Sequence, residues 1–126
     1  MKLIDTCVWV EVLRGTPTGR FFKPLIPPQG QLLVSTMVMY ELSKWLARNL
    51  GAEEADEVIA ALLTAQVIEP TANIALQAAE LSVTHKLHAM DALIYATALE
   101  HDADLVTCDA HFQGLPSVDY TPKVAA

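Results

Sequence analysis

Four acidic residues occupy positions where the surrounding sequence predicts an apolar helix face or the end of a strand. Asp91 lies on the same line of a predicted helix as Leu87 and Ile94. Asp109 follows the short apolar segment 105–107. Leaving an unpaired charge in apolar surroundings costs several kcal/mol. Each of these carboxylates therefore needs a cation, a hydrogen-bond network or a proton.

Glu41 repeats this anomaly on another predicted helix. It falls on the side of an apolar stripe that contains Val38 and Leu42. Two alternatives to a bound cation remain open at this point. The side chain bends out to solvent, or it pairs with Arg48, which lies two turns further along nearly the same face.

Asp5 stands at a predicted junction between a strand and a helix. It follows the apolar residues 2–4, and residues 6–13 then form a predicted helix that Gly15 closes. Functional groups of parallel sheets gather beyond the carboxyl ends of the strands. Asp5 and Asp109 each follow such an end, and the helices of the other two acids can border the same rim. Four acids from distant parts of the chain are therefore expected to converge.

Four converging carboxylates require a cation or protons. Two unit charges about 4 Å apart repel by about 4 kcal/mol at an effective dielectric constant of about 20. Oxygen ligands favour hard ions, Mg²⁺ or Mn²⁺, and no Cys or His occupies the four positions. Such an ion activates water as a nucleophile and neutralises charge on a phosphoryl oxygen. The acids therefore predict hydrolysis of a phosphodiester.

The elements that position these acids alternate between short apolar strands and helices. We expect residues 16–19 to interrupt the helical pattern. Helices are predicted at 6–13, 20–26, 36–49, 53–65, 71–86 and from 87 to an acidic turn at 101–104. Strands are predicted at 2–4, 31–34, 66–69, 105–107 and 118–120. This order is that of an α/β sandwich with a mostly parallel central sheet.

Length and composition limit the class of protein. A chain of 126 residues without internal repeats is expected to form one domain, residues 1–126. Hydrophobic residues make up 52% of it, so part of the apolar surplus is available for an oligomer interface. No apolar run approaches the roughly 20 residues of a membrane span. We therefore expect a cytoplasmic protein that does not engage a membrane, with Cys7 and Cys108 as reduced thiols.

The net charge of −7 argues at first sight against a nucleic-acid substrate. Phosphate binding usually leaves a basic footprint on a protein. Acids that surround a divalent cation belong to the metal site, however, and not to the surface that the substrate meets. The overall charge therefore excludes a prediction of tight nonspecific binding, but not a phosphodiester substrate.

Three segments together are similar to a known family. They read LIDTCVWVEVLRG at the start, STMVMYEL around Glu41, and AMDALIYATALEHDADLVTCDAHF near the end. Over nearly its whole length the chain resembles the PIN domain, specifically the VapC-type toxins of bacterial toxin–antitoxin pairs. The last segment is the most specific of the three. Met90 and Tyr95 depart mildly from the small residues that are common there.

The resemblance implies a PIN-like three-layer α/β/α sandwich with a short, mostly parallel central sheet. The family's acidic site falls on Asp5, Glu41, Asp91 and Asp109, and its hydroxyl falls on Thr107. The implied activity is that of a Mg²⁺- or Mn²⁺-dependent endoribonuclease that cleaves structured RNA such as transfer or ribosomal RNA. The implied assembly is a homodimer, inhibited by a VapB-like antitoxin whose tail lies across the site.

Within that site we assign a role to each acid. Asp5 and Asp91 hold the principal metal ion, and Asp109 and Glu41 complete the site directly or through water. One acid also orients the attacking water, and the sequence leaves open which one. His111 receives no role, although it lies close to Asp109 in the sequence.

Other interpretations fit parts of the sequence. His85 and His88 have the spacing of one helix face and of a metal pair, but a helix corner favours solvent or capping roles. A response-regulator receiver domain also has a Mg²⁺-binding acidic pocket, yet no adjacent acidic pair follows the first strand here. A free-standing PIN-domain nuclease and a non-catalytic PIN-like module that binds metal or RNA remain alternatives.

Overall fold

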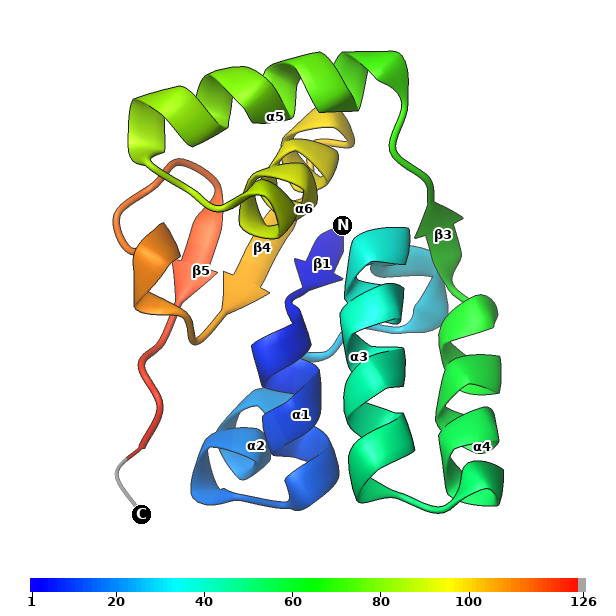
Figure 1. Ribbon diagram of the computed structural model, residues 1–126. Coiled ribbons are helices and arrows are strands. Elements are labelled where there is room, and N and C mark those ends of the chain that lie inside the picture. Colours follow the sequence, from blue (N-terminus) through cyan, green and yellow to red (C-terminus); the bar gives the residue numbers. More distant parts are fainter. Residues whose placement is uncertain (125–126) are drawn as a thin grey trace.

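A five-stranded sheet forms the centre of the protein in a computed structural model that describes residues 1–124 (Figure 1). Its strands run in the order β3-β2-β1-β4-β5, and every neighbouring pair is parallel. The sheet is thus parallel throughout, where the sequence predicted a mostly parallel one. The strands are β1 Lys2–Ile4, β2 Leu32–Ser35, β3 Gln66–Ile68, β4 Asp104–Thr107 and β5 Val118–Tyr120.

Helices cover both faces of this sheet, which confirms the three-layer α/β/α sandwich. Helices α5 and α6 pack on one face, and α1 to α4 lie on the other (Figure 1). The prediction that residues 1–126 form one domain extends beyond the described range and stays a prediction. The helices are α1 Thr6–Arg14, α2 Pro17–Phe22, α3 Thr36–Asn49, α4 Ala52–Leu63, α5 Ala72–His85 and α6 Ala89–Glu100.

The apolar residues of the central strands divide between the two layers. Leu3 and Leu105 pack in the cluster beneath α5 and α6. Their chain neighbours Ile4 and Val106 pack in the cluster formed with α1 to α4. This division follows from the pleat, which points successive side chains to opposite faces. Because β1 and β4 are buried on both faces, their carboxyl ends are held firmly where the candidate site begins.

The segment 16–19 is in part a correction to the sequence prediction: Thr16 is extended and interrupts the helical pattern, but Pro17 already begins helix α2. The Thr16 hydroxyl accepts a hydrogen bond from the backbone N–H of Gly19 at 3.0 Å, and Pro17 occupies the first helical position. A Cβ on Gly19 would clash with the carbonyl oxygen of Glu11 in α1. Thr16 and Pro17 thus form a helix start, and Gly19 allows α2 to approach α1 closely.

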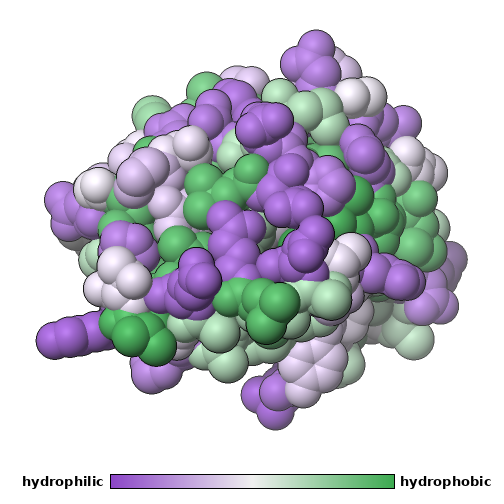
Figure 2. All heavy atoms as spheres, turned by 90° about the horizontal axis from the view of Figure 1, so that it is seen from above, coloured by the Kyte–Doolittle hydropathy of each residue, from purple (hydrophilic) through white to green (hydrophobic). Residues whose placement is uncertain are grey.

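Helix α5 is the outermost element of its layer. Its residues Leu76 and Val83 are 70% and 83% exposed. Figure 2 shows the molecule from this side, where hydrophilic and hydrophobic side chains are interleaved. Within residues 1–124, no helix combines the length and apolar character that crossing a membrane requires.

Candidate metal centre

Asp5 is held in place by the junction of β1 and α1. It is the N-cap of α1, and its Oδ1 accepts a hydrogen bond from the backbone N–H of Thr6 at 2.8 Å. Its Oδ2 accepts one from the Thr107 hydroxyl at 2.8 Å and another from the Cys7 thiol at 3.5 Å. The residue is only 5% exposed. Its carboxylate is therefore fixed in one orientation before any ligand arrives.

Burial raises the pKa of Asp5 to about 6. The hydrogen bonds from Thr107 and Thr6 favour the charged form and lower the pKa, but they do not offset the loss of solvation. The neighbouring carboxylate of Asp91 raises the pKa further. An ionised Asp5 thus lacks a compensating positive charge, and a bound cation would supply it.

Thr107 links the ends of β1 and β4 at this rim. Its hydroxyl donates to Asp5 and accepts a hydrogen bond from the backbone N–H of Asp109 at 3.0 Å. One hydroxyl proton and one lone pair are thereby used. Thr107 is completely buried, so its side chain is out of reach of a substrate. Its place in the structure is that of a positioning residue for two of the acids.

Asp91 and Asp109 form the more open part of the cluster, together with His111. The potential ligand atoms of these three residues lie within 4.8 Å of one another. Asp109 Oδ1 accepts a hydrogen bond from the backbone N–H of His111 at 2.9 Å and lies 2.8 Å from its Nδ1. Burial raises the pKa of Asp91, and the carboxylates of Asp109 and Glu41 raise it further. Asp91 therefore interacts electrostatically with each of the other three acids, whereas Asp5 and Glu41 do not belong to the described group whose ligand atoms lie within 4.8 Å.

Glu41 reaches this rim from α3. Its side chain is half-buried, and Oε1 accepts a hydrogen bond from the Thr6 hydroxyl at 2.8 Å. The alternative pairing with Arg48 is not formed, because the salt bridges among residues 1–124 do not involve either side chain. Thr6 therefore ties α3 to the helix that Asp5 caps.

Three neighbours of the acids were not predicted from the sequence, namely Thr6, Cys7 and His111. Each lies within two positions of Asp5 or Asp109 in the chain. That proximity was the available signal, but the direction of a side chain beyond a strand end depends on the turn. Cys7 and Cys108 are free cysteines in the structure, and the Cys7 sulfur lies 3.6 Å from the Thr107 hydroxyl.

His85 and His88 lie at the corner between two helices, as predicted, and not on one helix face. His85 is the last residue of α5, and His88 is the N-cap of α6. The His88 ring centroid lies 6.1 Å from that of His111. His88 therefore borders the open part of the acidic cluster, whereas His85 ends the neighbouring helix.

The arrangement fits a hard divalent cation. Carboxylate oxygens dominate the donor set, and Mg²⁺ and Mn²⁺ prefer oxygen ligands. The burial of Asp5 and the crowding around Asp91 provide an independent reason for a cation, since both raise the cost of ionisation. His111 adds a nitrogen donor that Mn²⁺ accepts more readily than Mg²⁺ does.

Fold and site together define an α/β sandwich with an acidic centre at the carboxyl ends of its parallel strands. The family model of the PIN domain matches residues 2–117, and the chain belongs to this family. None of the curated protein sequences compared with the chain matches it.

Solved structures of toxin–antitoxin proteins share the fold. A toxin–antitoxin complex from Klebsiella pneumoniae aligns with a TM-score of 0.80 and 25% identity, covering 94% of this chain and 96% of that one. VapBC2 from Rickettsia felis, bound to a fragment of its promoter DNA, gives 0.73 and 18%, with 98% of each chain covered. VapC20 from Mycobacterium tuberculosis, a toxin that cleaves the sarcin-ricin loop, gives 0.72 and 22%, covering 92% and 95%.

Proposed function

We propose that the protein is a Mg²⁺- or Mn²⁺-dependent endoribonuclease that hydrolyses phosphodiester bonds in RNA. The observation that carries this proposal is the group formed by Asp91, Asp109 and His111, together with the electrostatic influence between Asp91 and both Asp5 and Glu41. Asp5 is a buried carboxylate without a positive partner, and the neighbouring Asp91 is crowded by other carboxylates but accessible. Such a pair suits a cation-dependent hydrolase better than a purely structural network.

The chain's own residues would divide the work between them. Asp5 and Asp91 would hold the principal ion, and Asp109 and Glu41 would complete its surroundings directly or through water. When bound, the ion would lower the pKa of a water molecule and neutralise charge on the phosphoryl oxygen. Thr107 would hold Asp5 and Asp109 in fixed positions relative to each other. A carboxylate of the open part would orient the attacking water.

We further propose that the protein is the toxin of a toxin–antitoxin pair. Support comes from the PIN domain match and from the toxin–antitoxin structures that share the fold over nearly their full length. The partner would be a VapB-like antitoxin that covers the acidic rim, and the active species would be a homodimer in the cytoplasm.

RNA cleavage by the purified, antitoxin-free protein tests the proposal. We expect cleavage of bacterial RNA with millimolar Mg²⁺ or Mn²⁺ and none with EDTA. The Asp91→Asn variant should fold and fail to cleave. Metal-independent cleavage, or full activity of that variant, would refute the metal-dependent nuclease. Toxicity on induction in cells that an adjacent reading frame suppresses would distinguish a toxin from a free-standing nuclease.

A further inference from the structure

A groove beside the acidic rim follows helix α3. It encloses about 420 Å³, and its lining includes Tyr40, Glu41, Lys44, Trp45, Arg48 and Met90. Glu41 belongs to the acidic rim as well, and Met90 directly precedes Asp91 in α6. The groove, called the α3 groove below, is therefore continuous with the proposed site of cleavage.

Three residues of the α3 groove recur at intervals of four along the helix. Tyr40, Lys44 and Arg48 thus lie on one face of α3. The Lys44 Nζ lies 5.3 Å from the centroid of the Tyr40 ring, at cation–π distance. The Tyr40 side chain is 56% exposed, so one aromatic surface and two cations are presented together.

These cations are scarce in this protein, and no acidic side chain of the described residues neutralises them. The chain has 8 Lys and Arg residues against 15 Asp and Glu residues. In the part of the chain that the structure describes, neither Lys44 nor Arg48 forms a salt bridge. Both side chains are exposed and free to bind an anion. Cations next to an accessible aromatic ring are the usual elements of a single-stranded nucleic-acid site.

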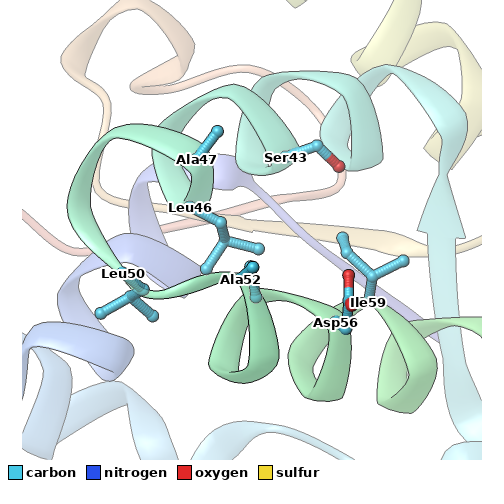
Figure 3. Close-up of a pocket in the computed structure, with 8 residues that line it drawn as sticks. Ser43, Leu46, Ala47, Leu50, Ala52, Asp56 and Ile59 are labelled. Carbon is cyan, nitrogen blue, oxygen red and sulfur yellow. The ribbon is translucent and has the colours of Figure 1, made fainter.

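The opposite side of α3 lacks these features. There a hollow of about 410 Å³ lies between α3 and α4, bordered by apolar residues such as Leu46, Leu50 and Ile59 (Figure 3). The charged residue in its lining is Asp56, which repels phosphate. Helix α3 therefore offers an anionic strand a favourable surface on its Tyr40 side, next to the acidic centre.

We propose that the α3 groove binds a single-stranded segment of the RNA substrate beside the bond that is cut. This inference rests on the proposed ribonuclease function. Lys44 and Arg48 bind backbone phosphates, and the Tyr40 ring stacks against an unpaired base. Bases within a duplex are already stacked on their neighbours, so the groove selects single-stranded over double-stranded RNA.

Fluorescence anisotropy with a labelled single-stranded RNA of mixed sequence tests the two cations. The Lys44→Gln/Arg48→Gln variant loses two phosphate contacts, so the slope of log K against log salt should fall by about 1.4 in magnitude. The control is Lys2→Gln/Lys23→Gln, which removes the same charge from residues that do not line the groove. Its slope should stay close to that of the wild type.

Tyr40 is tested by the same measurement. The Tyr40→Ala variant should bind the single strand roughly 5- to 140-fold more weakly, because it loses one stacked base. Tyr40→Phe keeps the ring and should restore most of the affinity. The preference of the wild type for the single strand over a duplex of the same sequence should shrink in Tyr40→Ala.

The outcomes separate this inference from the proposed function. If the wild type cleaves RNA but the α3 variants bind the single strand as well as the wild type does, the groove proposal is wrong and a protein partner becomes the alternative occupant. An equal loss in the control variant would also overturn the proposal. If the wild type fails to cleave but Lys44, Arg48 and Tyr40 govern RNA binding, the nuclease proposal fails and the groove stands.

Discussion

Asp5 and Asp91 bring carboxylates to the same rim, but the protein surrounds them differently. Asp5 is buried and receives hydrogen bonds from Thr6, Cys7 and Thr107. Asp91 is half-buried, and no comparable set of donors surrounds it in the described residues. The fold therefore fixes the half of the site around Asp5 and Thr107, called the buried half below. The half around Asp91, Asp109 and His111, called the open half, is left accessible to an ion and a substrate.

The same contrast extends to the neighbours of these two acids. Thr107 is completely buried beside Asp5, whereas the His111 side chain next to Asp109 is 64% exposed. Changes in the buried half should therefore alter stability and activity together. Changes in the open half should alter metal binding and catalysis with little effect on folding.

The largest effect is expected from the open half. Asp91→Asn removes a proposed ligand of the ion that provides transition-state stabilisation, so cleavage should fall by roughly 1000-fold, equivalent to about 4 kcal/mol. The melting temperature of the metal-free variant should equal or exceed that of the wild type, because a crowded charge is removed. Cleavage assays and thermal melts check both expectations.

Asp102→Asn is the matched control, because it makes the same change at an exposed acid outside the cluster. Its cleavage rate should resemble that of the wild type. Equal losses in the two variants would mean that Asp91 acts only through the overall charge of the protein.

The buried half should impose a pH dependence on the stability of the metal-free protein. The pKa of Asp5 is about 6 in the folded protein and 3.8 in its unperturbed state, so the folded protein binds the proton more tightly. This contribution is fully present below pH 4 and is lost as the pH rises through 6. The loss amounts to roughly 3 kcal/mol, since each pKa unit corresponds to about 1.4 kcal/mol.

Urea unfolding between pH 4 and 7 in EDTA measures this dependence. Asp5→Asn should flatten the curve over that interval, because its amide does not titrate. Divalent ions should also bind the wild type more weakly below pH 6, since a proton then competes at Asp5. Parallel curves for the two proteins would show that Asp5 does not control the titration.

Thr107→Val should weaken metal binding in both halves of the site, because the Thr107 hydroxyl is hydrogen-bonded to Asp5 and to the backbone N–H of Asp109. The variant removes one of the three hydrogen-bond donors of the Asp5 carboxylate and leaves the Asp109 N–H without its partner, which costs about 1–3 kcal/mol of unfolding free energy. Metal affinity should fall roughly 10- to 100-fold, as it does when the hydrogen-bonding partner of a ligand is removed. Thr107→Ser keeps the hydroxyl and should retain the metal affinity.

Metal titration and urea unfolding of the two Thr107 variants distinguish a positioning role from simple packing. Packing alone would make the serine variant, which loses a methyl group, less stable than the valine variant. In that case the hydroxyl would have no part in holding the acids.

The smallest effect is expected from His111→Ala in the open half. An exposed contact of this kind between two side chains contributes about 0–1 kcal/mol to stability, so the melting temperature should hardly change. Affinity for Mn²⁺ should fall by about 10-fold or less, because the imidazole supports Asp109 from the edge of the cluster. His85→Ala, at the end of α5, is the control for calorimetric titration and should bind Mn²⁺ normally.

The sequence predicted the open half and the strand ends better than it predicted the links between them. Asp91 was recognised because a charge interrupted an apolar helix line, a signal that local periodicity carries. The parallel sandwich followed from alternating strands and helices, and the PIN domain match bears it out. The hydrogen bond between Thr6 and Glu41 joins residues 35 positions apart, and local patterns carry no information on such a pair.

The prediction for residues 17–19, at the start of α2, failed for a different reason. Thr16, Pro17 and Gly19 are common in turns, and the same residues also suit a helix start. Packing against α1 decides between the two, through the close approach of Gly19 to the backbone of Glu11. Tertiary contacts of this kind cannot be inferred from local sequence patterns.

Anomalous diffraction from crystals grown with Mn²⁺ would show whether the four carboxylates hold a divalent ion. We expect a manganese ion bonded to carboxylate oxygens of Asp5 and Asp91, with Asp109 and Glu41 bound directly or through water. Manganese ordered only at other residues, with these four carboxylates contacting water and protein alone, would contradict this expectation.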